Sequence, residues 1–247
     1  PLPEVAALGS LVRLAETAEE FERQLEAALK EDSPEAIKNR REFAKANTWE
    51  QRFNTLAPAV AETFPRASII IVTFNNLELN RLCLEKLYEQ TEWPNYEVIV
   101  VDNDSTDGTR EFLQEAESAY QNLRVVLNDA NLGFAAANNI GLKMATGEFL
   151  VLLNNDTVVT RGWLSALLRH LIANPDIGLV GPVTNAIANE ARIEVAYQQI
   201  EDMPNWAAGY VRDHDCETFS IPMLAMFCVA MRRDVFERTG LLDEQFG

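Results

Sequence analysis

The chain has 247 residues, of which 47% are hydrophobic, and this is enough apolar surface for one large domain, alone or with a smaller appendage. Acidic residues outnumber basic residues by 38 to 21, and the formal net charge of −17 argues against partners such as nucleic acids or anionic membrane surfaces. Three scattered cysteines, no signal peptide and no run near the ~20 apolar residues of a membrane span predict a cytoplasmic protein without a transmembrane segment.

Residues 1–64 are expected to be helical and to form a segment separate from residues 65–247. Polar residues with the spacing of helix N-caps mark three helix starts, and apolar residues at helical spacing follow the first and the third. The three start signals are Thr17 with Glu20, Ser33 with Pro34, and Thr48 with Gln51. Three amphipathic helices of this length make only a thin bundle, so their apolar faces need a partner, either the rest of the chain or another domain.

Residues 65–247 alternate between short apolar runs and amphipathic stretches, which predicts an α/β fold with a mostly parallel, doubly wound sheet. Leu79, Leu82, Cys83 and Leu87 are expected to face the core, as is Cys228. Strands are expected at 67–73, 96–102, 123–128, 149–153, 177–180 and 219–231, helices at 77–90, 109–120, 134–145, 161–173 and after Arg232, and an irregular polar excursion at 183–218.

Polar side chains follow four of the predicted strands, at the point where each strand ends. These ends are Thr73–Asn76, Asp102–Ser105, Asn128–Asp129 and Asn154–Asp156. Ligands of open α/β sheets bind at the carboxyl ends of the strands, so four such ends predict a lined crevice. The alternative for Asn154–Asp156 is a turn that caps the next helix.

The crevice lacks the glycine-rich sequences of a dinucleotide site and of a P-loop. Carboxylates and amides remain for recognition. Asp102 can accept hydrogen bonds from a base or a ribose hydroxyl, and Asp156 can bind a divalent cation that also ligates a diphosphate. Such a cation offsets the repulsion between an acidic protein and an anionic nucleotide.

Five phrases, in order, resemble family 2 glycosyltransferases of the GT-A fold over about residues 66–247. They are Ile71–Asn75, Val101–Thr109, Asn131–Gly141, Leu152–Thr157, and Ala230–Glu237 with Leu242–Gly247. A second, less specific resemblance links Leu11–Thr17 and Arg41–Arg52 with the C-terminal tail of a GT-B glycosyltransferase domain. It implies that residues 1–64 end a preceding domain and that the full-length polypeptide has further domains.

The family 2 resemblance implies a role for each matching residue. The nucleoside pocket is expected to contain Thr73, Asn75, Asp102 and Asp104, with Gly133 and Asn139 near the donor. Asn154, Asn155 and Asp156 occupy the D-x-D position, where Asp156 is the metal ligand and Asn154 replaces the first acid. Asp243 and Glu244 are expected on the acceptor side.

The implied reaction is inverting transfer of a hexosyl or deoxyhexosyl group from a UDP-, dTDP- or GDP-linked donor, with Mn²⁺ or Mg²⁺, to a glycan or lipid-linked acceptor. Cell-surface polysaccharide synthesis, at the inner face of the membrane through partners, is the expected setting. In the family the catalytic base follows the D-E-x-F-G phrase, so it is expected beyond Gly247, and this fragment is expected to bind its donor but transfer sugar poorly.

Several residues have alternative interpretations. Asp107–Gly108 is expected to be a turn and helix start, and His170 to be structural. Arg232 and Arg233 either bind phosphate or lie at a solvated helix start, and His214 is a minor candidate for a metal or substrate contact. Two other function classes stay open, which are a sugar nucleotidyltransferase and a non-catalytic interaction module.

Overall fold

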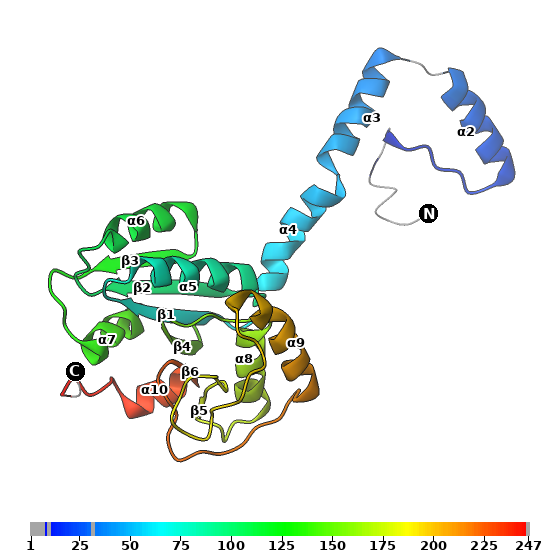
Figure 1. The fold of residues 1–247 in the computed structure, drawn as a ribbon. Helices are drawn as coiled ribbons and strands as arrows, with labels where there is room; N and C mark the ends of the chain where they lie inside the picture. The colour runs from blue at the N-terminus through cyan, green and yellow to red at the C-terminus, as the bar shows by residue number, and fades with distance from the viewer. Residues whose placement is uncertain (1–7, 9–10, 31–32, 246–247) are drawn as a thin grey trace. The chain divides into compact units, whose positions relative to one another are not determined.

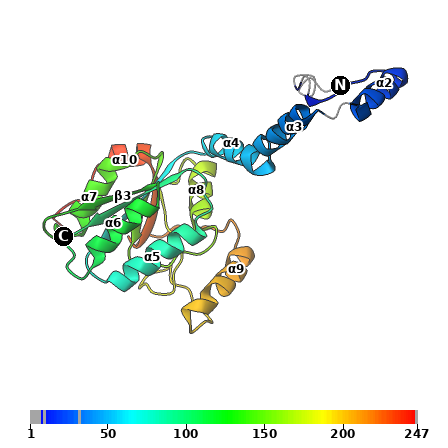
Figure 2. The same ribbon diagram turned by 90° about the horizontal axis from the view of Figure 1, so that it is seen from above.

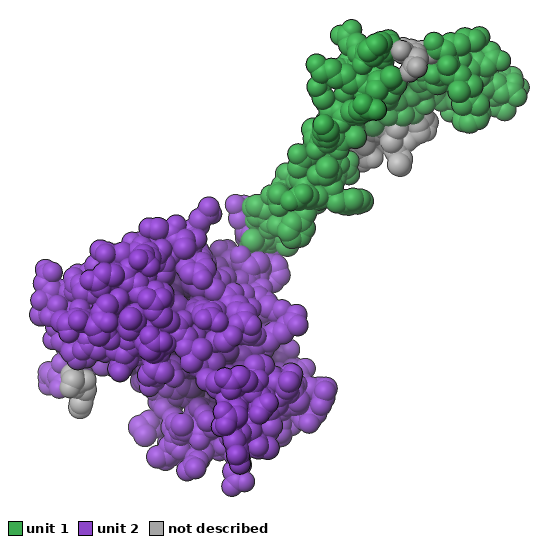
Figure 3. Space-filling view, turned by 45° about the horizontal axis from the view of Figure 1, so that its top comes forward, with its two compact units in different colours: residues 1–61 green, residues 62–247 purple. Residues whose placement is uncertain are grey.

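The computed structural model describes residue 8 and residues 11–30 and 33–245. The chain divides into two compact units, residues 1–61 and residues 62–247, which are coloured separately in Figure 3. In the described part of the chain no helix is long and apolar enough to cross a membrane. The phrase predicted at the C-terminal end includes Phe246 and Gly247, which lie outside the described residues.

Residues 1–61 contain the helices α2 (Ala18–Lys30), α3 (Pro34–Ala46) and α4 (Trp49–Ala61). The predicted N-caps are present: the Thr17 hydroxyl accepts from the Glu20 amide at 3.1 Å, the Ser33 hydroxyl accepts from the Ala36 amide, and Thr48 and Gln51 bond each other reciprocally. None of these helices has a buried residue. Most of the large apolar side chains of α2 and α4, including Phe21, Trp49 and Phe53, are exposed. The GT-B tail resemblance stays a prediction.

Residues 62–247 form a six-stranded sheet in the order β3-β2-β1-β4-β6-β5 (Figure 1). The strands are β1 (Ala67–Thr73), β2 (Tyr96–Asp102), β3 (Leu123–Leu127), β4 (Phe149–Asn154), β5 (Leu179–Val180) and β6 (Cys228–Arg232). The first four run parallel, as their continuous apolar sequences predict, whereas β6 is antiparallel to β4 and to β5. This is the predicted α/β class with a mostly parallel sheet.

Helices cover both faces of the sheet, and the alternation of side chains along each strand decides which face a residue meets. Ile69 and Ile71 pack in a core with α5 (Leu77–Gln90), α6 (Thr109–Ala119) and α8 (Trp163–Ala173). Ile70 packs in a second core with α7 (Phe134–Met144) and α10 (Arg233–Thr239). Figure 2 shows α7 and α10 on one side of the strands, and α5 and α6 on the other.

Three of the predictions about single elements are wrong. The excursion 183–218 contains a 3-10 helix (Ile200–Asp202) and the helix α9 (Met203–Asp213). The last long strand begins at Cys228, not at 219, because Pro222 interrupts the alternating pattern and cannot donate to a strand ladder. Leu79 is 43% exposed, because α5 turns Asn80, Cys83, Leu84 and Leu87 inward.

Candidate functional site

The four polar strand ends lie along one edge of the sheet, because β3, β2, β1 and β4 are adjacent and parallel. In register, Thr73 is beside Asp102 and Val72 is beside Asn154. The chain leaves β1 toward β2 and β3, then returns to the other side of β1 as β4. The boundary between β1 and β4 is therefore a topological switch point, where ligands of such sheets bind.

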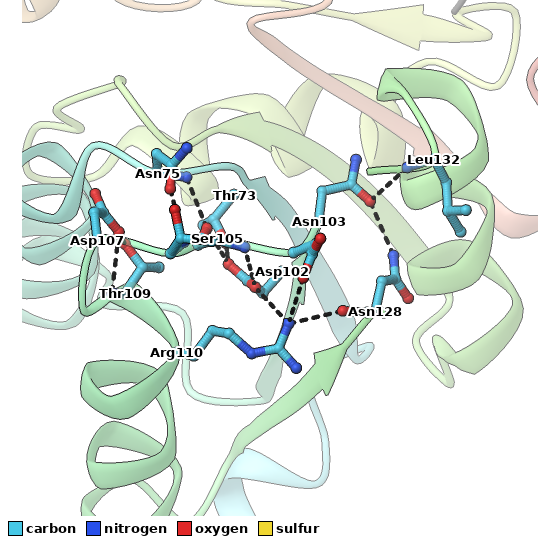
Figure 4. A network of polar contacts seen from close by, with 12 residues as sticks. Thr73, Asn75, Asp102, Asn103, Ser105, Asp107, Thr109, Arg110, Asn128 and Leu132 are labelled. Atoms are coloured by element: carbon cyan, nitrogen blue, oxygen red, sulfur yellow. Dashed lines mark hydrogen bonds and ion pairs between the residues drawn. The ribbon is translucent and has the colours of Figure 1, made fainter. Parts of the chain in front are cut away.

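Asp102 lies at the centre of a buried hydrogen-bond network at the end of β2 (Figure 4). Its side chain is 0% exposed. The Thr73 hydroxyl donates to its Oδ1 at 3.0 Å, and Ser105 donates from its hydroxyl at 2.5 Å and from its amide at 3.0 Å. These bonds satisfy the carboxylate within the protein, so Asp102 organises the loops. Its predicted contact with the nucleoside, like that of Thr73, stays a prediction.

The loops after β1 and β2 hold three non-glycine residues with positive φ. Asn75 has a φ of 55°, Asn76 of 62° and Asp104 of 67°. This conformation costs energy for L-residues, and residues that adopt it are frequent at functional sites. Reciprocal bonds join the two loops, since the Asn75 amide donates to the Ser105 hydroxyl at 2.7 Å and the Asn75 side-chain oxygen accepts from the Thr106 amide at 2.9 Å.

Arg110, in the first turn of α6, is a site residue that the sequence interpretation missed. Its guanidinium donates to the Asn128 carbonyl at 2.7 Å and lies 3.6 Å from a carboxylate oxygen of both Asp102 and Asp104 (Figure 4). It therefore joins the ends of β2 and β3 and supplies the positive charge beside two carboxylates. Its only signal in the sequence is its position in the first turn of the helix that follows the polar strand end.

Asn80, in α5, is a second residue that sequence interpretation missed, and it joins three loops of the site. Its side chain is buried, with the residue 1% exposed. Its amide group donates to the Asn75 carbonyl at 2.8 Å and to the Thr109 hydroxyl at 3.1 Å, and its oxygen accepts from the Asn155 side chain at 2.6 Å. Asn80 thus connects the loop after β1 with the turn after β4.

The Asn154–Asp156 segment forms a turn at the end of β4, but it does not cap a helix, since α8 begins at Trp163 after Gly162. The Asp156 residue is exposed. Beneath the turn, the Cys83 sulfur lies 3.7 Å from the Asn154 carbonyl oxygen, and burial, followed by the Asp156 charge, raises the pKa of this thiol to about 12. Cys83 is therefore a core residue, as predicted, and so is the buried Cys228.

Within the described residues, no group of three or more His, Cys, Asp or Glu side chains is arranged to hold a metal ion. Asp156 is the carboxylate at the end of β4, and the amide oxygens of Asn154 and Asn155 accompany it in sequence. This donor set consists of oxygen atoms, which suits a hard divalent cation, but one carboxylate needs further oxygens to complete a coordination shell.

The loop after β3 is fixed by Asn103, which is 2% exposed. Its amide group donates to the Asn131 side chain and the Gly133 carbonyl, each at 3.1 Å, and its oxygen accepts from Asn128 and from the Leu132 amide. Gly133 has a φ of 83°, which explains the glycine. The structure therefore brings Gly133 to the same edge as the ends of β1 and β2.

Asn139, in α7, is buried and bonds to the backbone of Leu242 and the side chain of Glu244. The structure thus joins a residue predicted near the donor to one predicted on the acceptor side, and both roles stay predictions. Asp243 accepts from the Gln245 amide at 3.0 Å in a local turn. Asp243 and Glu244 are both exposed.

The other candidates have structural partners. Asp107 accepts from Thr109 and from the Leu77 amide, and these hydrogen bonds, that from the Thr109 hydroxyl first, hold its pKa below the usual range. Asp107 therefore links the N-terminal ends of α5 and α6. As predicted, the helix α6 starts directly after Asp107–Gly108. His170 lies partly buried within α8.

Arg232 and Arg233 lie at the predicted helix start, as the N-cap and the first residue of α10, but both are only partly exposed and their guanidinium groups bind backbone carbonyls. Phosphate binding by either residue stays a prediction. Arg232 donates to carbonyls of residues 171, 175 and 177, and Arg233 donates to the carbonyls of Gly147 and Ala145. These contacts fix the end of β6. His214 is exposed at the C-terminal end of α9, and its Nδ1 lies 2.8 Å from a carboxylate oxygen of Glu217.

The sequence profile of glycosyl transferase family 2 matches residues 68–240, which include β1–β6 and the polar strand ends. The chain belongs to glycosyl transferase family 2. A mannosyltransferase from Pyrobaculum calidifontis, solved in complex with GDP-Man and Mn²⁺, is similar to it with a TM-score of 0.55 and 28% sequence identity. The match covers 73% of this family 2 chain and 48% of that mannosyltransferase, and the predicted GT-A fold is confirmed.

Two relatives differ in how much of the family 2 chain they match. Glycosyltransferase AglE of Haloferax volcanii is 36% identical over 124 residues, which are 49% of this chain and 40% of AglE. The O-antigen biosynthesis protein RfbC of Myxococcus xanthus is 31% identical over 191 residues, which are 74% of this chain and 15% of RfbC. The chain therefore spans less than half the length of either relative.

Proposed function

We propose that this protein is an inverting glycosyltransferase that takes a hexosyl or deoxyhexosyl group from a nucleotide-diphosphate sugar. The observation that carries the proposal is the row of polar strand ends on both sides of the switch point between β1 and β4, within a family 2 chain. Membership of the family favours a glycan or lipid-linked acceptor and a role in polysaccharide or cell-surface glycan synthesis. The predicted cytoplasmic location stays a prediction.

In this proposal the nucleoside lies against the loops after β1 and β2. The network around Asp102 and Thr73 holds these loops, and Asn75 and Asp104 present polar groups that remain partly accessible. Gly133 allows close approach of the backbone on the β3 side. Asn154 and Asn155 extend the donor site onto β4, and Asp243 and Glu244 lie on the acceptor side.

The proposal includes a divalent cation, Mn²⁺ or Mg²⁺, at Asp156. The mannosyltransferase of Pyrobaculum calidifontis was solved with Mn²⁺. A lone exposed carboxylate fits a cation that takes its remaining oxygens from water and from the donor diphosphate, as Mg²⁺ does in many nucleotide sites. When bound, the cation supplies positive charge to the departing diphosphate. The cation is therefore expected to bind weakly alone and tightly together with the donor.

The test is thermal unfolding of the protein with UDP-, GDP-, CMP- and dTDP-sugars, with Mn²⁺ or with EDTA. A donor at 100 times its Kd stabilises by about 2.7 kcal/mol, which raises the Tm of a domain of this size by about 5–11 °C. One donor is expected to give this rise in Mn²⁺ and little rise in EDTA. Asp156→Ala is expected to lose the metal-dependent part, whereas Asp176→Ala, at an exposed aspartate after α8, keeps it.

Two outcomes would replace the proposal with another function. Release of pyrophosphate from a nucleoside triphosphate and a sugar phosphate would identify a sugar nucleotidyltransferase. Failure of every donor to bind in Mn²⁺, in a protein that unfolds cooperatively, would identify a non-catalytic interaction module.

A further inference from the structure

Asn139 makes three hydrogen bonds to one short segment that is more than 100 residues away in the chain. The residue is 1% exposed. Its side-chain oxygen accepts from the Leu242 amide, and its side-chain nitrogen donates to the Leu242 carbonyl and to Oε1 of Glu244, each at 2.9 Å. The carboxamide thus holds the backbone of Leu242 as a neighbouring strand would, and it fixes one oxygen of an otherwise exposed carboxylate.

The helix that carries Asn139 is itself fixed at the donor end. α7 begins after Gly133, whose carbonyl accepts from the Asn103 side chain at the end of β2. Leu242 packs against the core that α7 shares with the sheet. A single short helix therefore connects the loops of the donor site with the segment that contains Glu244.

We propose that Asn139 is a positioning residue that sets the Leu242–Glu244 segment and orients the Glu244 carboxylate toward a hydroxyl of the sugar acceptor. This inference rests on the proposed glycosyltransferase function, since that function defines an acceptor side. A carboxylate with one oxygen held by a carboxamide keeps its second oxygen to accept a hydrogen bond from a hydroxyl group. The Asn139 side chain is buried and directs its hydrogen bonds to this segment, so in this inference Asn139 acts through Glu244 in place of the role predicted for it near the donor.

A carboxamide can make this set of bonds because its oxygen accepts while its nitrogen donates two hydrogens. Asn139→Asp keeps the acceptor for the Leu242 amide, but it removes both donors and places a carboxylate against the Glu244 carboxylate. Adding Glu244→Gln supplies a new donor that can bond the introduced carboxylate. The pair of substitutions therefore restores one hydrogen bond with the donor and acceptor exchanged, whereas general damage to the fold would not be repaired.

The matched control is Asn138, the preceding residue in the same helix. It is also buried, at 2% exposure, but among the residues that the structure describes its side chain donates only to the Phe134 carbonyl within α7, at 2.8 Å. Asn138→Asp places the same new charge in the same helix without touching the Leu242–Glu244 segment. Any effect of Asn139→Asp that exceeds the effect of Asn138→Asp therefore belongs to the contact with that segment.

The experiment uses the full-length protein and measures hydrogen exchange of residues 240–245, together with the affinity for GDP-mannose and Mn²⁺ or for the donor found above. Asn139→Asp is expected to raise exchange of this segment at least tenfold and to leave donor affinity within twofold. Addition of Glu244→Gln is expected to recover part of the protection. With an acceptor such as an alkyl glycoside, the acceptor KM of Asn139→Asp is expected to exceed that of the unaltered protein. The donor KM is expected to be the same in both proteins.

Unchanged exchange in Asn139→Asp, an equal increase in Asn138→Asp, or no recovery in the double variant would overturn the inference. An acceptor KM that stays constant while segment exchange rises would also overturn it. Absence of donor binding in the unaltered protein would instead refute the proposed function, and the exchange result would then stand on its own as a structural contact.

Discussion

Replacement of Asn80 by leucine tests whether the two loops on either side of the switch point are held by one buried side chain. Leucine has the same branched shape and number of heavy atoms as asparagine, so Asn80→Leu leaves no cavity in α5. It removes the donors to the Asn75 carbonyl and the Thr109 hydroxyl, and it removes the acceptor for Asn155. The loops after β1 and β4 then lose their shared partner.

The magnitude follows from what happens to each former partner of Asn80. The Asn75 carbonyl loses this donor in a partly buried position, which costs about 1–3 kcal/mol. Thr109 keeps its bond to Asp107, and Asn155 is partly exposed to water, so these two losses cost about 1 kcal/mol each. The total is about 3–5 kcal/mol, which corresponds to a fall in Tm of about 6–20 °C at about 2–4 °C per kcal/mol.

The assay combines thermal unfolding with calorimetric titration of the donor in Mn²⁺. Asn80→Leu is expected to weaken donor binding about tenfold, which is about 1.4 kcal/mol of lost loop order. Leu87→Ala is the control, because Leu87 is 0% exposed in the same helix and packs only in the core. That substitution costs about 2–5 kcal/mol in stability, and its donor affinity is expected to stay within twofold. Equal loss of affinity in both variants would refute a positioning role for Asn80.

Two further predictions concern the opposite edge of the sheet. Burial raises the pKa of Glu97, but hydrogen bonds from Ser68 and Thr146 and the charge of Arg66 outweigh burial, so the pKa in the folded protein is lowered. The ionised Glu97 carboxylate therefore stabilises the fold above the unfolded pKa of about 4.3, and this stabilisation is lost as the pH falls through the folded pKa. The Tm of the unaltered protein is expected to fall between pH 7 and pH 3, and the Tm of Glu97→Gln is expected to fall less over the same range. Identical pH profiles of Tm in the two proteins would contradict this prediction. Gly147→Ala would place Cβ 2.7 Å from the backbone nitrogen of Ser68, so it is expected to lower the free energy of unfolding by about 1–3 kcal/mol and to lower the Tm. The control Gly178→Ala, where the nearest atom to the new Cβ is 3.9 Å away, is expected to leave the Tm unchanged.

The strands and helices that frame the site could be predicted because their patterns are local. β1, β2 and β4 are continuous apolar runs, and their lengths and polar ends agree with the structure to within a residue. Once the strands are parallel and adjacent, the polar ends must share an edge. The excursion before β6 lacked such regularity, and α9 was missed because it contains Pro204 and Gly209, residue types that are typical of turns and loops.

The contacts that join the loops of the site could not be predicted, because they link residues far apart in the chain. Asn80 is 75 residues from Asn155, and Asn139 is 105 residues from Glu244. An asparagine inside an amphipathic helix looks like a surface residue or a donor ligand until its partners are known. Residue types at strand ends can predict where a site lies, but tertiary contacts decide which of its residues position the others.

The buried side chains that hold this site are mainly neutral amides and hydroxyls, such as Asn80, Asn103 and Thr73, and the acidity of the protein explains the advantage of neutral groups. A buried carboxylate needs several donors, as Asp102 shows with Thr73, Ser105 and Arg110. A buried asparagine satisfies carbonyls and amides together without the desolvation cost of a charge. In an acidic protein with a formal net charge of −17, this arrangement organises the loops without adding negative charge beside an anionic donor. The carboxylates of Asp104, Asp107, Asp129 and Asp156 stay at least partly exposed at the polar strand ends. Asp104 is paired with Arg110 and Asp107 accepts from Leu77 and Thr109, whereas Asp156 is exposed at the end of β4, so removal of Asp156 should affect metal dependence far more than stability.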